Sequence, residues 1–204
     1  MVGVDNGIIG IDFDNTIVSY ERLFAAIASE LGFEPGKAGT GKLLLRNHLR
    51  ATGREQEWTA IQGRVYGLLI NEAEPFPGVM EFLKACLDSG RSVRIISHRT
   101  RYPILGEPVD LHQAARDWLG RIGILDLVPE DSIYFECTRE IKVGRIGQTG
   151  CGWFIDDLME VFEEPSFPPG IRRVLFDPHD HFRNPPIDIL RARSWMKIKH
   201  LLLV

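Results

Sequence analysis

Short runs of apolar residues recur along the chain and predict the strands of a parallel sheet. Their length and their lack of polar alternation are typical of strands that are buried on both faces. The runs lie at 7–13, 92–96, 132–135, 153–155 and 173–176. Aspartates end the first run and directly follow the fourth. Because open α/β sheets bind their ligands beyond the carboxyl ends of the strands, these aspartates are candidates for chemistry.

Helical patterns alternate with the apolar runs. Apolar residues spaced three and four positions apart predict helices over 78–88 and 109–119. The tail 187–204 is expected to form a terminal helix that packs through Leu190, Trp195 and the final leucines. Strands that alternate with helices favour an α/β fold, and we predict a Rossmann-like, doubly wound parallel sheet of five strands.

The segment 19–76 breaks this alternation, because it shows no convincing strand. Its helical patterns lie over 21–31, 42–51 and 55–71. We therefore predict that 19–76 is a helical cap inserted after the first strand, and that 1–18 and 77–204 form the core. Pro75 and Pro77 mark the return to the core, since proline stops a helix.

Composition and charge narrow the class of protein. A chain of 204 residues with 44% hydrophobic and 25% charged residues is typical of a globular core with a modest insertion. A net charge of −4 argues against binding to a nucleic-acid polymer. Cys86, Cys137 and Cys151 lack the spacing of a disulfide framework or a zinc site. With no apolar run of membrane-spanning length and no signal-peptide pattern, we expect a cytoplasmic protein without membrane partners, whose oligomeric state stays open.

The clearest chemical motif is DFDNT, residues 12–16, directly after the first apolar run. It brings two carboxylates, Asp12 and Asp14, to one strand end, where one can attack and the other can move protons. A carboxylate attacks an anionic phosphate only when a cation screens the charge, so this chemistry requires Mg²⁺ and further acids. By itself the motif also fits an Asx-turn or a helix N-cap.

Three later strand ends carry groups that would complete such a site. Asp156 and Asp157 supply carboxylates for a metal ion, and the Ser97 hydroxyl and the Lys142 ammonium can hold phosphoryl oxygens. Each of these groups alone is more often a cap, a turn hydroxyl or a solvated cation. Four such signals at four strand ends of one chain favour the functional interpretation.

These motifs, in this order, resemble the haloacid dehalogenase (HAD) superfamily over 10–176. The resemblance implies that Asp12 is a nucleophile that forms an aspartyl-phosphate and that Asp14 is the general acid and base. It also implies that Asp12, Asp156 and the Asp14 backbone carbonyl hold Mg²⁺, with Asp157 supporting the metal. An acid at position 14 favours phosphate esters over carbon–halogen bonds, because the dehalogenase branch lacks it.

The phosphate-binding residues implied by the resemblance are Ser97 and Lys142, with His98 beside the pocket and Arg139 able to share or replace the role of Lys142. Lys142 precedes Asp156 by only 14 positions, a spacing similar to that of the deoxyribonucleotidase-like branch. We therefore expect a phosphatase that acts on a small phosphate ester. The alternatives are a 5′-nucleotidase specifically, a phosphotransferase, or a non-catalytic phosphate-binding protein on this fold.

Three weaker patterns favour structural roles. Residues 36–42 nearly form a phosphate-binding loop, but Leu43 replaces the required hydroxyl residue and a linker is the expected structure. Residues 177–181 combine two histidines with two acids, and their composition predicts a surface loop. A basic stretch in the cap fits either a solvated helix face or a surface that meets an anionic substrate. It consists of Lys42, Arg46, His48, Arg50 and Arg54.

Overall fold

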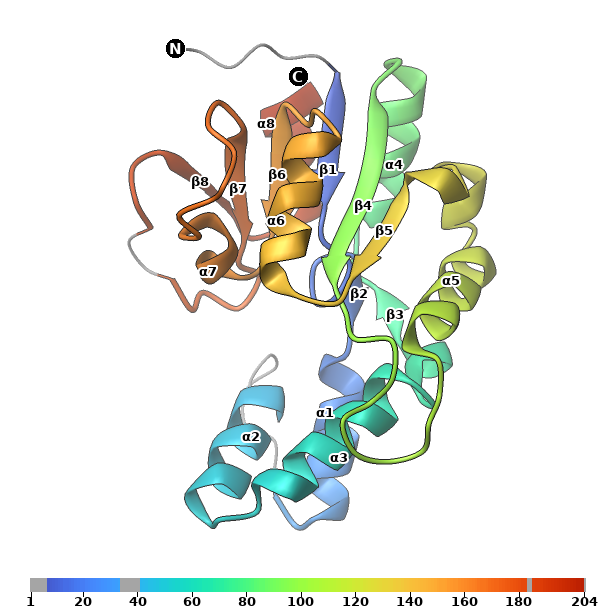
Figure 1. Cartoon of the computed structure of the whole chain (residues 1–204), viewed down its shortest axis with the longest axis vertical. Coiled ribbons are helices and arrows are strands. Elements are labelled where there is room, and N and C mark those ends of the chain that lie inside the picture. Colours follow the sequence, from blue (N-terminus) through green and yellow to red (C-terminus); the bar gives the residue numbers. More distant parts are fainter. Residues whose placement is uncertain (1–6, 34–40, 183–184, 204) are drawn as a thin grey trace.

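A six-stranded parallel sheet forms the centre of the computed structural model, which describes residues 7–33, 41–182 and 185–203 (Figure 1). Its strands are β1 (Ile8–Ile11), β4 (Ser92–His98), β5 (Ile133–Glu136), β6 (Trp153–Asp156), β7 (Arg172–Phe176) and β8 (Ile189–Ala192). The strand order is β5-β4-β1-β6-β7-β8, and every neighbouring pair is parallel. All six carboxyl ends therefore lie at one edge. The predicted Rossmann-like α/β fold is confirmed.

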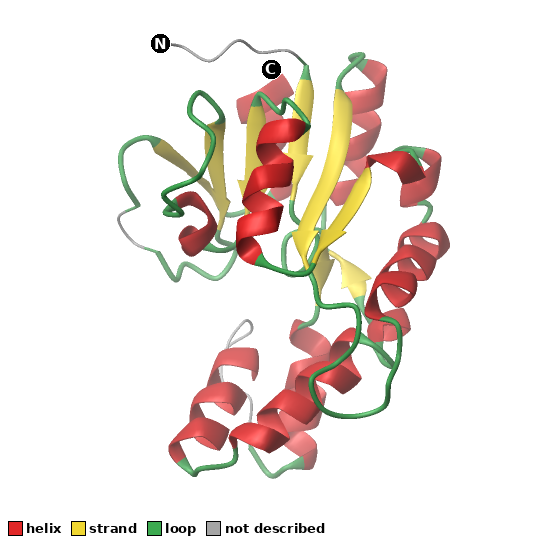
Figure 2. Ribbon diagram, viewed as in Figure 1, coloured by secondary structure: helices red, strands yellow, loops and turns green. Residues whose placement is uncertain are grey.

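Eight α-helices lie in the described residues, and some of them cover the two faces of the sheet (Figure 2). They are α1 (Glu21–Glu30), α2 (Gly41–Ala51), α3 (Glu55–Tyr66), α4 (Val79–Asp88), α5 (Leu111–Ile122), α6 (Arg139–Gln148), α7 (Met159–Phe162) and α8 (Trp195–Leu203), with short 3₁₀ turns at Ile70–Glu72, Ile124–Asp126 and Glu130–Ser132. In Figure 1, α6 crosses in front of the sheet and α4 lies behind it, while α1, α2 and α3 stand beyond the carboxyl edge. Within the described ranges, no helix is long and apolar enough to cross a bilayer.

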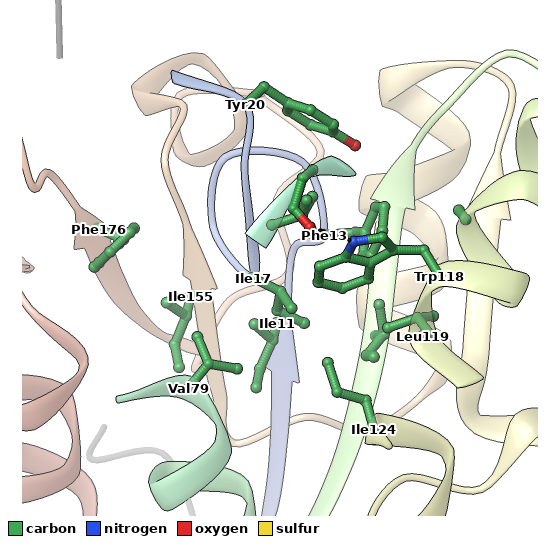
Figure 3. Close-up of a cluster of buried hydrophobic side chains, with 14 of the residues drawn as sticks. Ile11, Phe13, Ile17, Tyr20, Val79, Trp118, Leu119, Ile124, Ile155 and Phe176 are labelled. Carbon is green, nitrogen blue, oxygen red and sulfur yellow. Dashed lines mark hydrogen bonds between the residues drawn. The ribbon is translucent and has the colours of Figure 1, made fainter. Parts of the chain in front are cut away.

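Two apolar layers hold the sheet between these helices, because successive residues of a strand point to opposite faces. Ile95 and Ile155 belong to the layer with α4, α5 and α8, whereas Ile96 and Phe154 face α6 and α7. Phe13, the first residue past the candidate nucleophile, is fully buried in the larger layer (Figure 3). Its ring lies edge-on to those of two neighbours, at centroid distances of 5.5 Å from Trp118 and 5.6 Å from Phe135. This packing fixes the loop that carries both motif aspartates.

The predicted terminal helix over 187–204 is wrong in its first half. Residues Ile189–Ala192 form β8, a sixth strand paired with β7, and the helix begins only at Trp195. Ser194 accepts a hydrogen bond from the backbone N–H of Lys197 and so caps the helix start. Hydrogen bonding to an open sheet edge outweighs the weak local helix preference of these four residues.

Two further differences concern short elements. Segment 19–76 was expected to contain no strand, yet Val18–Ser19 (β2) pairs antiparallel with Glu74–Pro75 (β3) at its two ends. Lys142 and part of the glycine-rich region after it lie in the ten-residue helix α6, which the sequence does not predict. Its N-cap, Thr138, accepts the backbone N–H of Ile141, and its buried side chains offset the low helix propensity of the glycines.

Candidate active site

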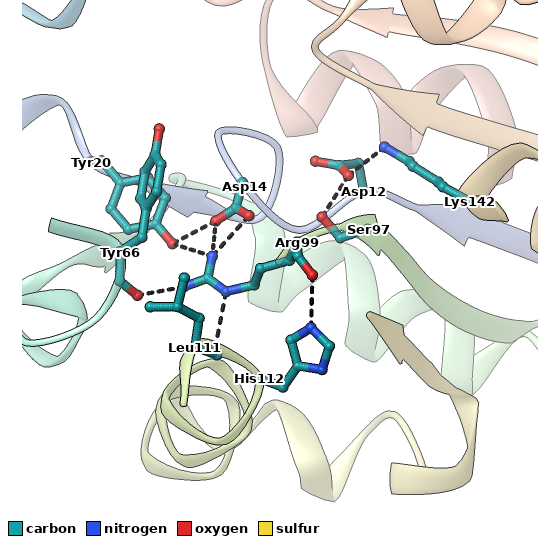
Figure 4. A network of polar contacts seen from close by, with 9 residues as sticks. All are labelled: Asp12, Asp14, Tyr20, Tyr66, Ser97, Arg99, Leu111, His112 and Lys142. Atoms are coloured by element: carbon teal, nitrogen blue, oxygen red, sulfur yellow. Dashed lines mark hydrogen bonds and ion pairs between the residues drawn. The ribbon is translucent and has the colours of Figure 1, made fainter. Parts of the chain in front are cut away.

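A tight turn after β1 carries Asp12 and Asp14. The backbone N–H of Asp12 donates to the Ile155 carbonyl at 2.8 Å, which ties the turn to β6. Asn15 has a φ of 60°, in the left-handed region that asparagine tolerates better than most residues. The turn sends the two carboxylates to different partners, as Figure 4 shows. Two acids only two positions apart therefore have separate surroundings.

The Asp12 carboxylate is buried, with 4% of the residue exposed, between a hydroxyl and an ammonium. Ser97 Oγ donates to Asp12 Oδ1 at 2.9 Å, and Lys142 Nζ donates to the same oxygen at 2.6 Å. Lys142 Nζ also reaches Asp156 Oδ2 at 2.6 Å. Burial raises the pKa of Asp12 to about 7, against the opposing effect of Lys142. Burial would lower the pKa of Lys142, but Asp12 and Asp156 outweigh it and raise that pKa.

Three carboxylates at this point could share a metal ion. One oxygen each of Asp12, Asp156 and Asp157 lies within 4.8 Å of the others. Burial raises the pKa of Asp157 well above its ordinary value, and Asp156 and Asp12 add to the rise. The two ammonium groups nearby, of Lys142 and Lys42, do not balance three acids, and carboxylate oxygens are the ligands that Mg²⁺ prefers. The donor set therefore fits Mg²⁺. The Asp14 carboxylate is not part of this cluster.

Asp14 is bound by Arg99 and Tyr20 (Figure 4). Arg99 Nη1 lies 2.6 and 2.8 Å from the two carboxylate oxygens, and the Tyr20 hydroxyl donates to Oδ1 at 2.7 Å. Arg99 also donates to the carbonyls of Leu111 and Tyr66. Burial would lower the pKa of Arg99, but Asp14 raises it. A buried guanidinium thus connects Asp14 to the end of α3 and the start of α5.

His98 and Arg139 lie at the rim of the same site. A cavity of about 260 Å³ is lined by both residues and by Asp12, Ser97 and Lys142. His98 Nε2 is 3.1 Å from the Cys137 carbonyl oxygen, and burial lowers the pKa of the imidazole. Arg139 pairs with Glu164 at 3.3 Å. Of the two cations considered for the phosphate-binding role, Lys142 is the one that contacts Asp12.

Sequence reasoning missed Arg99 and Tyr20 and singled out Lys42 only as one member of a basic stretch. Lys42, in the first turn of α2, lines the same cavity as Asp12, together with Tyr66 from α3. Arg99 follows Ser97 by two positions, which places it near the strand end. An arginine in that position is usually solvated, and its burial depends on acceptors from segments far apart in the sequence. Only the three-dimensional arrangement identifies these residues.

The weaker sequence patterns have separate outcomes. The predicted loop over 177–181 is confirmed: it follows β7, and buried Asp177 accepts the backbone N–H groups of His181 and Phe182. The predicted linker over 36–42 lies mostly outside the described residues. Its last two residues, Gly41 and Lys42, begin α2.

No protein-family model matches the chain, and no curated protein matches it. Its structure is similar to that of YfnB, a HAD hydrolase from Bacillus subtilis bound to magnesium, with a TM-score of 0.59, 11% identity and coverage of 97% of this chain and 98% of that one. It is also similar to a HAD-superfamily hydrolase of subfamily IA from Geobacter sulfurreducens, with a TM-score of 0.56, 14% identity and coverage of 98% of this chain and 100% of that one. A third similar structure is that of a HAD phosphatase from Thermococcus onnurineus, with a TM-score of 0.52, 14% identity and coverage of 96% of this chain and 97% of that one. The chain therefore has the fold of HAD-superfamily hydrolases over nearly its whole length.

Proposed function

We propose that this protein is a Mg²⁺-dependent phosphatase that hydrolyses a small phosphomonoester through an aspartyl-phosphate on Asp12. The observation that carries the proposal is the setting of the Asp12 carboxylate. It is buried, it contacts Ser97 Oγ and Lys142 Nζ, and it lies beside two further carboxylates. Hydroxyl and ammonium donors at these positions can hold the oxygens of a phosphoryl group while Asp12 attacks it.

The reaction takes place in two displacements. In the first, an Asp12 oxygen forms a bond to phosphorus, the bond to the ester oxygen breaks, and Asp14 gives its proton to that leaving oxygen. In the second, Asp14 takes a proton from water, the water oxygen bonds to phosphorus, and the bond from phosphorus to Asp12 breaks. Phosphate leaves, and both aspartates return to their starting states.

The residues that would hold Mg²⁺ are Asp12, Asp156 and Asp157, with the Asp14 backbone carbonyl as a further oxygen. When bound, the ion neutralises charge between the nucleophile and the phosphoryl oxygens. Ser97 and Lys142 would bind those oxygens as hydrogen-bond donors. His98 and Arg139 contribute at the rim of the cavity, where Arg139 is paired with Glu164.

The helical segment 19–76 is proposed to act as a cap over this site. Lys42 and Tyr66, from α2 and α3, line the cavity together with Asp12. A segment that supplies part of the wall of the catalytic cavity can exclude water during the transfer and can select the substrate. The cytoplasmic location expected from the sequence stays a prediction.

Phosphate release from nucleoside monophosphates, sugar phosphates and an aryl phosphate tests the proposal. Release should require Mg²⁺, stop with EDTA, and disappear in Asp12→Asn, while Asp88→Asn, an exposed change at the end of α4, should keep it. Preference for nucleotides would favour a nucleotidase, as the spacing of Lys142 and Asp156 suggests. Transfer to an added alcohol rather than water would indicate a phosphotransferase. Substrate binding without any release would support the non-catalytic alternative.

A further inference from the structure

A second cavity adjoins the one that contains Asp12. It has a volume of about 460 Å³ and lies between α2 and the loop after β7. Both cavities are lined by Asn15, Lys42, Asp157 and Leu158. The two spaces are therefore adjacent, and a molecule with its phosphoryl group at Asp12 can direct its remaining part toward the second cavity. The volume is within the range of small-ligand sites.

Three phenylalanines contribute to the apolar part of this second cavity, together with Leu43, Leu158 and Pro178. Phe76, Phe176 and Phe182 line it, and the rings of Phe76 and Phe176 lie edge-on with centroids 4.9 Å apart. Aromatic side chains of this kind bind flat apolar groups through dispersion and ring–ring contacts. This part of the cavity suits a ring rather than a polyol.

Two cations of the basic stretch in the cap line the second cavity, and the other three are otherwise engaged. The His48 ring lies 4.1 Å from the Phe33 ring, Arg50 forms a two-point pair with Glu55, and Arg54 does the same with Glu57. The two that line the cavity are Lys42 and Arg46, one turn apart on α2. The stretch is therefore not a uniform solvated face.

Arg46 is half-buried and has no carboxylate within ion-pair distance among the residues that the structure places. Its Nε donates a long hydrogen bond of 3.4 Å to Oδ1 of the neighbouring Asn47. Acids on the same cavity have partners of their own. Asp177 accepts two backbone N–H groups and pairs with Arg191 at 2.6 Å, and Glu21 lies 3.9 Å from His179. Glu160 is the exposed acid at the rim.

We propose that the substrate is a phosphomonoester with a ring-like apolar body and a second anionic group, which the Arg46 guanidinium binds in the cavity between α2 and the loop after β7. This inference rests on the proposed function, because the phosphate end must occupy the catalytic cavity. A guanidinium fork binds a carboxylate or a phosphate through two parallel hydrogen bonds. Lys42 lies between the two anionic ends, where it also faces Asp157.

Calorimetric binding of non-hydrolysable phosphonates tests this substrate class in the presence of Mg²⁺. The probes are phenylphosphonate, 4-carboxyphenylphosphonate and benzene-1,4-diphosphonate. One charge-assisted contact should make the two doubly anionic probes bind about tenfold to a hundredfold more tightly than phenylphosphonate. The stronger of those two identifies the second anion as carboxylate or phosphate.

Arg46→Gln should reduce this preference to less than about twofold, whereas Arg50→Gln, one turn further along α2, should retain it. The substrate class would be overturned by any of three results. These are equal binding of all three probes, a preference for the doubly anionic probes that survives in Arg46→Gln, and no binding of any phosphonate. Preferential binding without hydrolysis of the matching phosphates would support the anion site and refute the phosphatase. Hydrolysis of the phosphates without preferential binding of the doubly anionic probes would support the phosphatase and refute the anion site.

Discussion

Replacing Lys142 with methionine removes the ammonium that contacts both Asp12 and Asp156 and keeps a side chain of similar length. Lys142 Nζ is 2.6 Å from Asp12 Oδ1 and 2.6 Å from Asp156 Oδ2, and the three side chains are 2%, 5% and 0% exposed. Because no water can replace the lost partner easily, the remaining acids must stay charged and unpaired or take up a proton.

Removing one member of a buried ion pair costs about 3–5 kcal/mol. For a chain of this size, 1 kcal/mol corresponds to roughly 2–4 °C, so Lys142→Met should melt about 6–20 °C below wild type without metal at pH 8. Saturation with Mg²⁺ at a hundred times its Kd contributes about 2.7 kcal/mol to a protein that binds it. The site of the variant is more negative, so at the same Mg²⁺ concentration the variant gains more stability than wild type. The difference in melting temperature between the two proteins should therefore narrow when Mg²⁺ is added.

The pH dependence of this difference follows from the pKa shifts. The pKa of Lys142 is raised above its ordinary 10.5, so its stabilising effect is fully present at neutral pH and is lost only as pH rises through the folded value. Asp12 has a pKa of about 7 in the wild-type protein. Below that pH it accepts a proton, the unpaired charge in the variant decreases, and the difference in melting temperature should shrink.

Thermal melts of wild type, Lys142→Met and Lys197→Met at pH 5.5 and 8, with EDTA and with Mg²⁺, measure these effects. Lys197 is exposed on α8, and its replacement should change stability by less than about 0.5 kcal/mol. A loss of less than about 1 kcal/mol for Lys142→Met at pH 8 in EDTA would refute the electrostatic reasoning. The same conclusion would follow from a loss that does not depend on Mg²⁺ or on pH.

Three further changes test other parts of the structure. Mg²⁺ should bind about tenfold more weakly for each pH unit below 7, because Asp12 must lose a proton to become a ligand, and calorimetry that gives a flat profile would contradict this. Gly10→Ala would place a Cβ 2.5 Å from a Phe154 ring carbon and should lower the free energy of unfolding by about 1–3 kcal/mol in urea, whereas Gly144→Ala, which meets open space, should be neutral or stabilising. Arg99→Lys should lower kcat with little change in KM, since an ammonium cannot reproduce the planar guanidinium contacts, and an increase in KM alone would refute a positioning role.

Much of the catalytic cluster could be predicted because local signals and parallel topology agree. Asp12, Ser97 and Asp156 each follow or end an apolar run, and such runs are short-range features that a sequence displays directly. In the sheet, β1 lies between β4 and β6, so the ends of these three strands are neighbours. Parallel pairing then brings together residues that are far apart in the chain, without any further information.

What could not be predicted depends on non-local partners. Residues 189–192 have no strong strand pattern, and they become β8 because β7 offers an open edge. Arg99 has the sequence features of a solvated strand-end residue, yet four acceptors from separate segments bury it. A glycine-rich segment became α6 through its cap and its buried face. In each case tertiary contacts outweighed weak local preference.

The different surroundings of Asp12 and Asp14 support the assignment of two chemical roles to two acids in one turn. Burial raises the pKa of Asp12 to about 7, and Asp156 and Asp14 add to the rise against the opposing effect of Lys142, so without a metal ion a large share of the proposed nucleophile is protonated at neutral pH. A divalent ion among the three carboxylates would favour the charged, reactive form. Asp14 lies outside that cluster and is bonded to Arg99 and Tyr20. Metal binding would therefore act on the proposed nucleophile, and the contacts of Arg99 on the proposed acid–base residue. Changes at Lys142 should then impair the displacements at phosphorus, and changes at Arg99 the proton transfers that accompany them.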